Sequence, residues 1–354
     1  MSESKPTLRW GIIGTGVISS WFVQDLSLER EDAQAIHHIQ AIGSSSAEKG
    51  ADFVKTHLPN QSQPPTVYGS YDEAYKDPEV DIIYIGTPHA FHKKNCLDAI
   101  AQGKHVLCEK AFTLNAREAR EVLDAAKQKG VFVMEAMWTR FLPLVKTLQK
   151  LVHEDKAIGD VVRVFCDFSM NQRFESLGPE SRLKNRALGA GSLLNIGMYS
   201  LTWGLLTLDS GVGDSAKTPK ISAAQTLAEG VDVSTSIVLL YPDGKQGILS
   251  SNMSVKTPTE FCRIEGKTGH IVVKGPAASV PQSFIVYTSQ EPEGKTYDFG
   301  HAGRGFYWEA DAVALSIAAG KMENDVMPWA ETIRVMETMD EVRRQGGATY
   351  PQDE

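Results

Sequence analysis

The sequence predicts an α/β fold in two parts: a doubly wound parallel sheet in the N-terminal half, then an α+β region with a large, mostly antiparallel sheet. Two observations carry this prediction. As far as residue 136, short apolar strand-like runs alternate with helical segments, which is typical of a parallel sheet covered by helices on both faces. After residue 139, runs of alternating apolar and polar residues are joined by short, turn-rich links, which is typical of an antiparallel sheet with one covered face.

Length and composition agree with this fold class. The chain has 354 residues, enough for two domains, and we expect them at residues 1–138 and 139–354. A net charge of −8 argues against a nucleic-acid partner, because contacts to phosphates need a basic surface. No apolar run approaches the ~18 residues that a membrane-spanning helix needs, so we expect no membrane partner.

The chain start and the cysteines point to the cytoplasm. Residues 1–6 contain no apolar core of a signal peptide. The cysteines are scattered and show no C-x-x-C spacing, so we expect free thiols in a reducing compartment and neither a disulfide framework nor a zinc site. No other metal-ligand set stands out. The four cysteines are Cys96, Cys108, Cys166 and Cys262.

A glycine-rich turn near the N-terminus is the first candidate binding element. The strand-like run 8–13 ends at Gly14 and Gly16, and the helical run 17–27 follows. The first glycine of such a turn makes the tight bend, the second lets the backbone approach a pyrophosphate, and the helix N-terminus offers free N–H groups. Ser19 stands where the dinucleotide-binding fingerprint has its third glycine, and a serine is small enough for close helix–strand packing. We therefore predict a Rossmann domain that binds a dinucleotide through Gly14, Thr15, Gly16, Val17 and Ile18.

The end of the second strand favours NADP over NAD. An acidic residue at this position bonds the ribose 2′-hydroxyl of NAD. Here the strand 38–43 is followed by three serines and, shortly after, Lys49, which can accept a 2′-phosphate. A serine at this place also commonly caps the next helix. The predicted contacts are Ser44, Ser45 and Lys49.

Two further strands end in polar residues. The apolar runs 80–85 and 105–108 read as buried parallel strands, and ligands of such sheets bind at the carboxyl ends of the strands. Lys110 follows the second of these runs, although a lysine in a loop is, by itself, more commonly a solvated side chain. We expect the two histidines to position the cofactor or shape the pocket rather than to ionise. The predicted contacts are Thr87, Pro88, His89, His92, Glu109 and Lys110.

The second domain is expected to be an α+β domain. A linking helix at 144–154 precedes a strand at 161–168, and the segment 189–199 reads as a loop that enters a helix. The last helix, 328–345, could pack back towards the first domain. The further expected strands are 221–227, 235–241, 246–253, 261–265, 271–274 and 283–288.

Taken together, these motifs resemble the glucose–fructose oxidoreductase/inositol dehydrogenase family. The marks are the glycine-rich turn, the segment 86–89 with His92, and Glu109-Lys110, where the family has Glu-Lys-Pro. Within the family, the runs Met-Glu-Ala-Met-Trp-Thr-Arg-Phe at 134–141 and Gly-Met-Tyr at 197–199 resemble dimeric dihydrodiol dehydrogenases and fungal NADP-dependent D-xylose 1-dehydrogenases. The sequence departs from the family pattern at two positions: Ala111 replaces the proline of Glu-Lys-Pro, and Asn195 replaces a common aspartate.

The resemblance implies an acid–base pair. It offers Tyr199 as the group that exchanges a proton with the substrate hydroxyl, and Lys110 as its helper. A free tyrosine, with a pKa of about 10, is a poor base at neutral pH. A lysine cation ~4 Å away stabilises the phenolate by about 4 kcal/mol at an effective dielectric constant of ~20, before desolvation opposes it. The candidates for the substrate pocket are Trp138, Arg140, Arg186 and Asn195. For Trp138 and Arg186, a structural role is an equal alternative.

The resemblance further implies an NADP-dependent oxidation of the C1 hydroxyl of a cyclic aldose, most closely D-xylose, to its lactone. A trans-1,2-dihydrodiol dehydrogenase would use the same machinery. A different class, a non-catalytic regulator that senses nucleotide, disagrees with the presence of both Lys110 and Tyr199. The branch and the alternating second-domain strands predict a homodimer that forms through the exposed face or edge of the second sheet.

Overall fold

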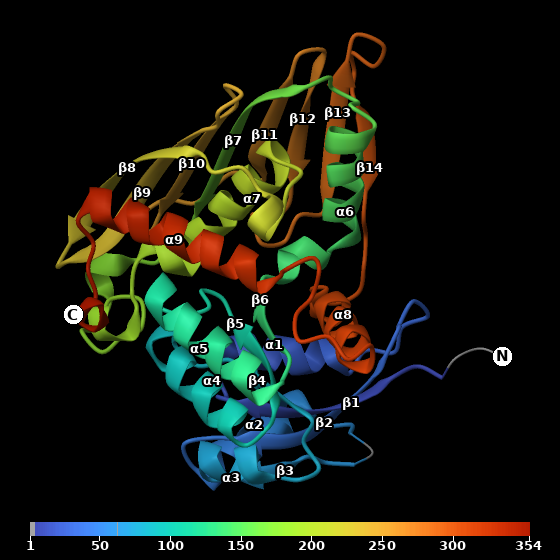
Figure 1. Ribbon diagram of the computed structural model, residues 1–354, viewed down its shortest axis with the longest axis vertical. Coiled ribbons are helices and arrows are strands. Elements are labelled where there is room, and N and C mark those ends of the chain that lie inside the picture. The colour runs from blue at the N-terminus through green and yellow to red at the C-terminus, as the bar shows by residue number, and fades with distance from the viewer. Residues whose placement is uncertain (1–3, 62) are drawn as a thin grey trace. The chain divides into compact units, whose positions relative to one another are not determined.

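The computed structural model describes residues 4–61 and 63–354, so the first three residues of the predicted N-terminal domain lie outside it (Figure 1). The chain divides into two compact units, which are described separately. Unit 1 comprises Met1–Thr113, Arg117–Phe141 and His301–Trp329, and unit 2 comprises Leu114–Ala116, Leu142–Gly300 and Ala330–Glu354. The predicted fold class is confirmed. In contrast to a single boundary after residue 138, unit 1 runs to Phe141, leaves out Leu114–Ala116 and includes His301–Trp329.

Unit 1 contains a six-stranded parallel sheet in the order β3-β2-β1-β4-β5-β6. Because all neighbours are parallel, the carboxyl ends of the strands meet at one edge, where ligands of such sheets bind. The strands are β1 (Thr7–Ile13), β2 (Ile36–Gly43), β3 (Thr66–Tyr68), β4 (Ile82–Ile85), β5 (His105–Glu109) and β6 (Val133–Ala136). The helices of this unit are α1 (Val17–Leu26), α2 (Ala47–His57), α3 (Tyr71–Lys76), η1 (His89–Phe91), α4 (His92–Ala101), α5 (Ala116–Lys129), η2 (Trp138–Phe141) and α8 (Phe306–Ala318).

An aromatic cluster fills the core between β1, β4, α1 and α8. Phe22 stacks on Tyr84 with ring centroids 3.9 Å apart, and Trp10 meets Phe22 edge-on at 5.1 Å. Phe306, at the start of α8, packs edge-on against Phe22 at 6.2 Å. All four side chains are fully buried. The chain segment that carries α8, late in the sequence, therefore contributes to the core that packs on β1 and β4.

Unit 2 is built on an eight-stranded sheet in the order β14-β13-β12-β11-β7-β10-β9-β8. Only β7 and β10 pair in parallel, and every other pair of neighbours is antiparallel. The strands are β7 (Val161–Ser169), β8 (Lys220–Ala228), β9 (Val231–Leu240), β10 (Gln246–Asn252), β11 (Glu260–Gly266), β12 (Gly269–Lys274), β13 (Ser283–Thr288) and β14 (Lys295–Asp298).

Helices cover one face of this sheet. Helix α7 (Met198–Leu208) is buried along its whole length and packs on β7 and β10, while α9 (Trp329–Gly346) runs across the sheet (Figure 1). The predicted linking helix is present as α6 (Pro143–Gln149), which continues as the π-helical turn η3 (Lys150–Glu154). A second π-helical turn, η6 (Leu193–Gly197), leads directly into α7. The remaining short helices are η4 (Phe174–Ser176), η5 (Arg186–Leu188), η7 (Gly213–Ser215) and η8 (Pro351–Asp353). Among the described residues, no helix combines the length and the hydropathy that crossing a bilayer requires.

Candidate active site

The glycine-rich turn joins β1 to α1 with an open helix N-terminus. Gly14 has φ +89°, a left-handed conformation that favours glycine. A Cβ on Gly16 would meet only the Gly86 carbonyl oxygen, at 3.9 Å, so the space above this residue is open. Gly16 is the N-cap of α1 and no side chain caps the helix, whose first residue, Val17, is 64% exposed. The first N–H groups of α1 are therefore available to an anionic ligand.

Ser19 takes the place of the third fingerprint glycine, and Gly86 makes room for it. The Ser19 side chain is fully buried, and a Cβ on Gly86 would overlap its Oγ. That Oγ has no hydrogen-bond partner among the described residues. Helix α1 thus packs closely against the end of β4 because the glycine stands at the strand end, as Gly86, and not in the helix.

The serine cluster after β2 separates into different roles. The Ser46 side chain accepts the Lys49 N–H and caps α2. Ser45 is exposed, and Lys49 Nζ donates to its Oγ at 3.3 Å. Ser44 is buried, with its Oγ 3.4 Å from Thr15 Oγ1. The Ser45–Lys49 pair is the part of the cluster that presents a hydroxyl and a cation to solvent.

His92 ties together two loops at the carboxyl edge of the sheet. Its Nε2 lies 2.8 Å from the Thr87 carbonyl oxygen and its Nδ1 lies 2.9 Å from the Ala111 carbonyl oxygen. A neutral imidazole can donate to only one of them. Burial lowers the pKa of His92, and the two carbonyls oppose that effect. Since the ring is fully buried, its evident role is to hold the loop that follows Lys110 against the loop that follows β4.

The residue before Lys110 belongs to a buried acidic cluster. Tyr84 donates its hydroxyl hydrogen to Glu109 Oε1 at 2.7 Å, and the Lys110 N–H donates to Glu109 Oε2 at 3.2 Å. Burial raises the pKa of Glu109. Glu309, on α8, is fully buried, and neither of its oxygens has a hydrogen-bond partner among the described residues. Burial, reinforced by nearby Glu109, raises the Glu309 pKa well above its usual range. Our sequence reasoning missed Glu309, because only the fold brings α8 behind β5.

Lys110 directly follows this cluster at the end of β5. Its side chain is half-buried, and the peptide bond between Lys110 and Ala111 is cis. Two of the predicted substrate contacts, Trp138 and Arg140, lie on η2 and are 3% and 2% exposed, and the Trp138 ring stacks on Phe306 at 4.5 Å. Lys110, Trp138 and Arg140 therefore all belong to unit 1.

The predicted tyrosine lies in unit 2, at the start of α7. Tyr199 is 4% exposed and meets Phe168 of β7 edge-on, with ring centroids 5.6 Å apart. Asn195, one turn earlier on η6, accepts a hydrogen bond from Arg182 Nη1 at 3.4 Å. Our sequence reasoning did not single out Arg182, which lies on a long loop. The pairing of Tyr199 with Lys110, which lies in the other unit, stays a prediction.

Arg186, another predicted substrate contact, makes hydrogen bonds within unit 2. Its Nε and Nη2 donate to the Thr349 carbonyl oxygen at 3.1 and 2.8 Å, and Nη2 also donates to Thr349 Oγ1 at 2.8 Å. These bonds fix the C-terminal segment against η5. A structural role thus explains this arginine, and its contact with substrate stays a prediction.

The carboxyl edge of unit 1 fits a dinucleotide. It offers an open helix N-terminus for the pyrophosphate, space above Gly16, and an exposed cation and hydroxyl at the end of β2. Within residues 4–61 and 63–354, no cluster of three or more His, Cys, Asp or Glu side chains is arranged to hold a metal ion.

Family models match most of the chain. One, described as an oxidoreductase family with an NAD-binding Rossmann fold, matches residues 8–137. The second, the GFO/IDH/MocA C-terminal domain, matches residues 145–272. Among solved structures, levoglucosan dehydrogenase in complex with NADH and levoglucosan has a TM-score of 0.81 and 18% identity, with 96% of this chain and 97% of the other covered. At this identity, the likeness shows the fold alone.

Curated relatives match almost end to end. The D-xylose 1-dehydrogenase (NADP(+)) of Hypocrea jecorina is 36% identical, with 99% of this chain and 95% of the relative covered. The trans-1,2-dihydrobenzene-1,2-diol dehydrogenase of Bos taurus is 33% identical, with 98% and 99% covered. The predicted family and the predicted enzyme class are thereby confirmed. The chain belongs to the GFO/IDH/MocA family of oxidoreductases and is an NAD(P)-dependent dehydrogenase that acts on CH–OH groups.

Proposed function

We propose that this enzyme oxidises the C1 hydroxyl of a cyclic aldose to the lactone with NADP, and that D-xylose is its foremost substrate. The observation that carries the proposal is the 36% identity, over nearly the full length of both chains, with a D-xylose 1-dehydrogenase (NADP(+)). A cyclic aldose presents a carbinol carbon that loses a hydride and a hydroxyl that loses a proton. Bound nicotinamide supplies the hydride acceptor.

Tyr199 and Lys110 are our candidates for the proton transfer. The phenolate of Tyr199 would take the proton of the C1 hydroxyl as the carbonyl forms. Lys110 would stabilise that phenolate by its positive charge, because a bare tyrosine is too weakly acidic to ionise near neutral pH. Behind Lys110, the Glu109–Tyr84 hydrogen bond and the His92 contacts hold the loop on which the lysine lies.

The proposed preference for NADP rests on the Ser45–Lys49 pair at the end of β2, together with Ser44. A Ser45→Asp substitution would place a carboxylate beside the 2′-phosphate, so we expect it to lower kcat/KM for NADP and to raise kcat/KM for NAD. Steady-state kinetics with both cofactors measure this ratio. A Ser45→Asn control keeps the size without the charge. A clear preference of the unsubstituted enzyme for NAD would contradict the assignment.

A trans-1,2-dihydrodiol dehydrogenase is the second candidate function. It is supported by the 33% identity with the bovine enzyme over 98% of this chain. The deciding experiment is a screen of NADP reduction across pentoses, hexoses and trans-dihydrodiols under one set of conditions. The proposal requires kcat/KM to be highest for D-xylose among these substrates. Higher kcat/KM for the diols would transfer the assignment to the second candidate.

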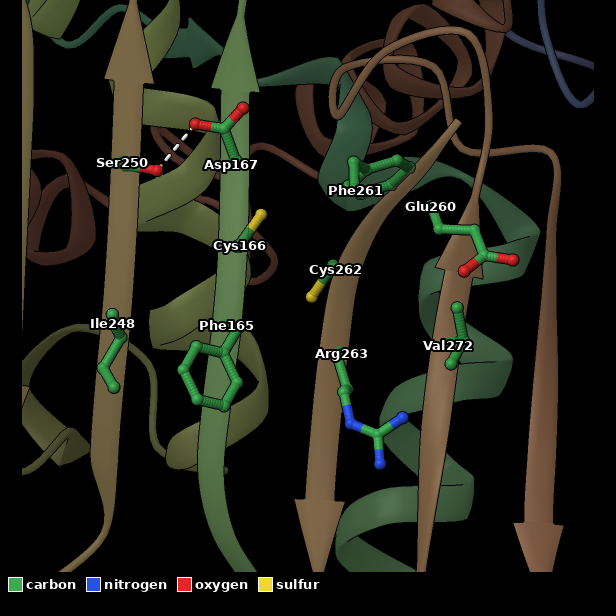
Figure 2. A pocket seen from close by; sticks show the side chains of 10 residues that line it. All are labelled: Phe165, Cys166, Asp167, Ile248, Ser250, Glu260, Phe261, Cys262, Arg263 and Val272. Carbon is green, nitrogen blue, oxygen red and sulfur yellow. Dashed lines mark hydrogen bonds between the residues drawn. The ribbon is translucent and has the colours of Figure 1, made fainter. Parts of the chain in front are cut away.

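We further propose that the enzyme is a homodimer that associates through the open face of the unit 2 sheet. Five residues that the strand register places side by side form a row across this face, one on each of β9, β10, β7, β11 and β12. In that order they are Val238, Ile248, Phe165, Arg263 and Val272. Four of these five residues line a groove of about 410 Å³, and Figure 2 shows them on neighbouring strands. Val238 and Ile248 are 41% and 38% exposed. Phe165, beside them, is half-buried, and Arg263 is exposed, so this face combines exposed apolar side chains with a cation. Exposed apolar side chains bordered by polar ones are typical of a protein interface.

The proposed location is the cytoplasm. The four cysteines are free thiols, and all four side chains are buried. Two of them, Cys166 and Cys262, lie directly opposite one another on β7 and β11 and are not joined. Unjoined neighbouring thiols suit a reducing compartment. Recovery of the enzyme activity in a cytosolic fraction, separate from organelle markers, would support this location.

A further inference from the structure

A buried carboxylate anchors the helix that carries Asn195 and Tyr199. Asp232, at the start of β9, is 1% exposed. Its Oδ2 accepts hydrogen bonds from the Leu193 N–H at 2.8 Å, from Ser192 Oγ at 2.9 Å and from Thr235 Oγ1 at 3.0 Å. Leu193 is the first residue of η6, and η6 continues without a break into α7. Asp232 therefore binds the N-terminus of this helix, where backbone N–H groups lack intrahelical partners.

The surrounding hydroxyls are arranged for an anion. Ser251 Oγ donates to Ser192 Oγ at 3.1 Å, and Gln225 Nε2 donates to Thr235 Oγ1 at 3.0 Å. The hydroxyls of Ser192 and Thr235 thus each accept one hydrogen bond and donate another to the Asp232 carboxylate. The carboxylate is the acceptor at which both chains of donors end. Hydrogen bonds to a charged acceptor are roughly twice as strong as those to a neutral one.

The backbone is shaped to let the carboxylate approach. Gly191 has φ +137°, and a Cβ on it would overlap Asp232 Oδ1. A Cβ on Gly197, at the end of η6, would come within 2.7 Å of Ser251 Oγ. Two glycines therefore allow η6 to lie close over β9 and β10. π-helical turns such as η6 are rare and frequently occur at functional sites.

We propose that Asp232 is a positioning residue of the dehydrogenase: its carboxylate holds the N-terminus of η6 and thereby fixes Asn195 and Tyr199 for the reaction. This inference rests on the proposed function for the roles of those two residues. It assigns Asp232 no contact with substrate, since the carboxylate lies beneath the helix, on the sheet. The hold should be strongest while the carboxylate is charged.

The charge state of Asp232 changes close to neutral pH. Burial raises its pKa to about 6, against the lowering effect of the three donors. No cation of the described chain forms an ion pair with it, and Gln225, Ser192, Thr235 and Ser251 carry no charge. The titratable group beside it is Tyr350, whose pKa burial raises well above its usual range, so this tyrosine stays neutral. If η6 is released while Asp232 stays buried, only the donors to its charged form are lost, so the hold on η6 should weaken as the pH falls through about 6.

The test compares the enzyme with its Asp232→Asn variant, which keeps the shape of the side chain and removes the charge. We expect kcat at about pH 8 to fall by about tenfold, with KM for the cofactor unchanged, because the reacting groups are displaced while the dinucleotide site is untouched. Below about pH 6 the natural side chain also becomes neutral, so the ratio of the two kcat values should approach one. The titration of Tyr199 affects both enzymes and cancels in this ratio.

Hydrogen–deuterium exchange supplies a readout that needs no substrate. In Asp232→Asn we expect faster exchange confined to residues 193–199, matched by the unsubstituted protein at about pH 5 after correction for the intrinsic rate. The matched control is Asp209→Asn, a buried aspartate at the other end of α7 that accepts the Lys217 N–H at 2.7 Å. It should leave the exchange of residues 193–199 and the pH dependence of the kcat ratio unchanged.

A kcat ratio that is the same at every pH, or unchanged exchange at residues 193–199, would overturn the proposal. If Asp232→Asn does not fold, Thr235→Val removes one donor and should move the pH at which exchange increases upwards; an unmoved pH overturns the proposal as well. If no sugar or diol is oxidised, the proposed function fails, and the exchange measurement alone then decides the role of Asp232 in holding η6.

Discussion

At the scale of single residues, two buried acids differ in the hydrogen bonds that they receive and therefore in their pKa values. Asp232 and Glu309 are both fully buried acids, and burial raises the pKa of each. Asp232 receives three hydrogen bonds and has a pKa of about 6, whereas Glu309 receives none from the described residues and lies near Glu109. Hydrogen bonds to the charged form therefore limit the rise in the pKa of Asp232, whereas burial and the nearby Glu109 raise the pKa of Glu309 without such opposition.

Asp232 should make the stability of the protein depend on pH. Complete unfolding, unlike the local release of η6, exposes this carboxylate to water. Its pKa is about 6 in the folded protein, against an ordinary value of 3.8, so the folded state binds the proton more tightly. The free energy of unfolding should therefore fall, by about 3 kcal/mol from this group, as the pH rises from about 4 to above 6. Asp232→Asn removes this contribution. Urea unfolding of both proteins across this pH range measures it, and a constant difference between them would contradict the assigned pKa.

The proposed pair of Lys110 and Tyr199 predicts a specific pattern of losses. Tyr199→Phe removes the oxygen that takes the proton and keeps the ring, so kcat should fall by ~10²–10⁴ while NADP affinity is retained. Lys110→Met should also lower kcat, and its remaining activity should keep rising to higher pH, because the tyrosine then ionises without the cation.

The double variant separates a pair from two independent residues. If the two residues act as one unit, Lys110→Met/Tyr199→Phe should lose much less than the product of the two single losses. Single-turnover kinetics with saturating NADP measure the chemical step in all four proteins. Losses that simply multiply would mean that Lys110 acts without Tyr199, and His89 or a water molecule would become the candidate base.

At the scale of elements, the sequence predicted those whose pattern is local. The alternation of strands and helices in the first half identified strands β1, β2, β4 and β5 of the parallel sheet. Strand β14 was missed because Lys295–Asp298 is short, polar and largely exposed, so it has no apolar face to detect. The π-helical turn η6 was read as a loop, since its geometry depends on Asp232 and on the close approach of Gly197 to β10. Those contacts join residues far apart in the chain.

The packing of helix α1 on the sheet gives a prediction for this element. Gly86→Ala would insert a Cβ against the buried Ser19 Oγ, so either the Ser19 side chain would have to rotate within the core or α1 would have to shift. We expect a loss of about 1–3 kcal/mol in the free energy of unfolding and, where the helix N-terminus moves, weaker NADP binding. The double variant Ser19→Gly/Gly86→Ala restores the room and should recover most of both losses. Thermal unfolding and cofactor titration measure them, and equal losses in the single and double variants would contradict this account.

At the scale of the whole molecule, the sequence predicted the fold class and the family, because both rest on motifs read in order along the chain. It did not predict that His301–Trp329, late in the sequence, belongs to the compact unit of the parallel sheet. Glu309 and the aromatic contacts of Phe306 follow from that placement. Arg186 illustrates the same limit, since only the structure places Thr349 beside it. Residues chosen by type need the fold to decide between a ligand contact and a structural one.

The proposed homodimer is a prediction about the whole molecule. The row through Val238, Ile248 and Phe165 lies on the open face of the sheet, and a stable interface buries about 800 Å² on each partner. Light scattering should give the mass of a dimer at micromolar concentration. Ile248→Arg, within the row, should dissociate the dimer, because an unpaired charge would be buried at the centre of the interface.

Val255→Arg is the matched control: Val255 is 57% exposed and lies outside the strands, so its charge should leave the mass unchanged. A monomer in the unsubstituted protein, or a dimer that withstands Ile248→Arg, would exclude this face as the interface.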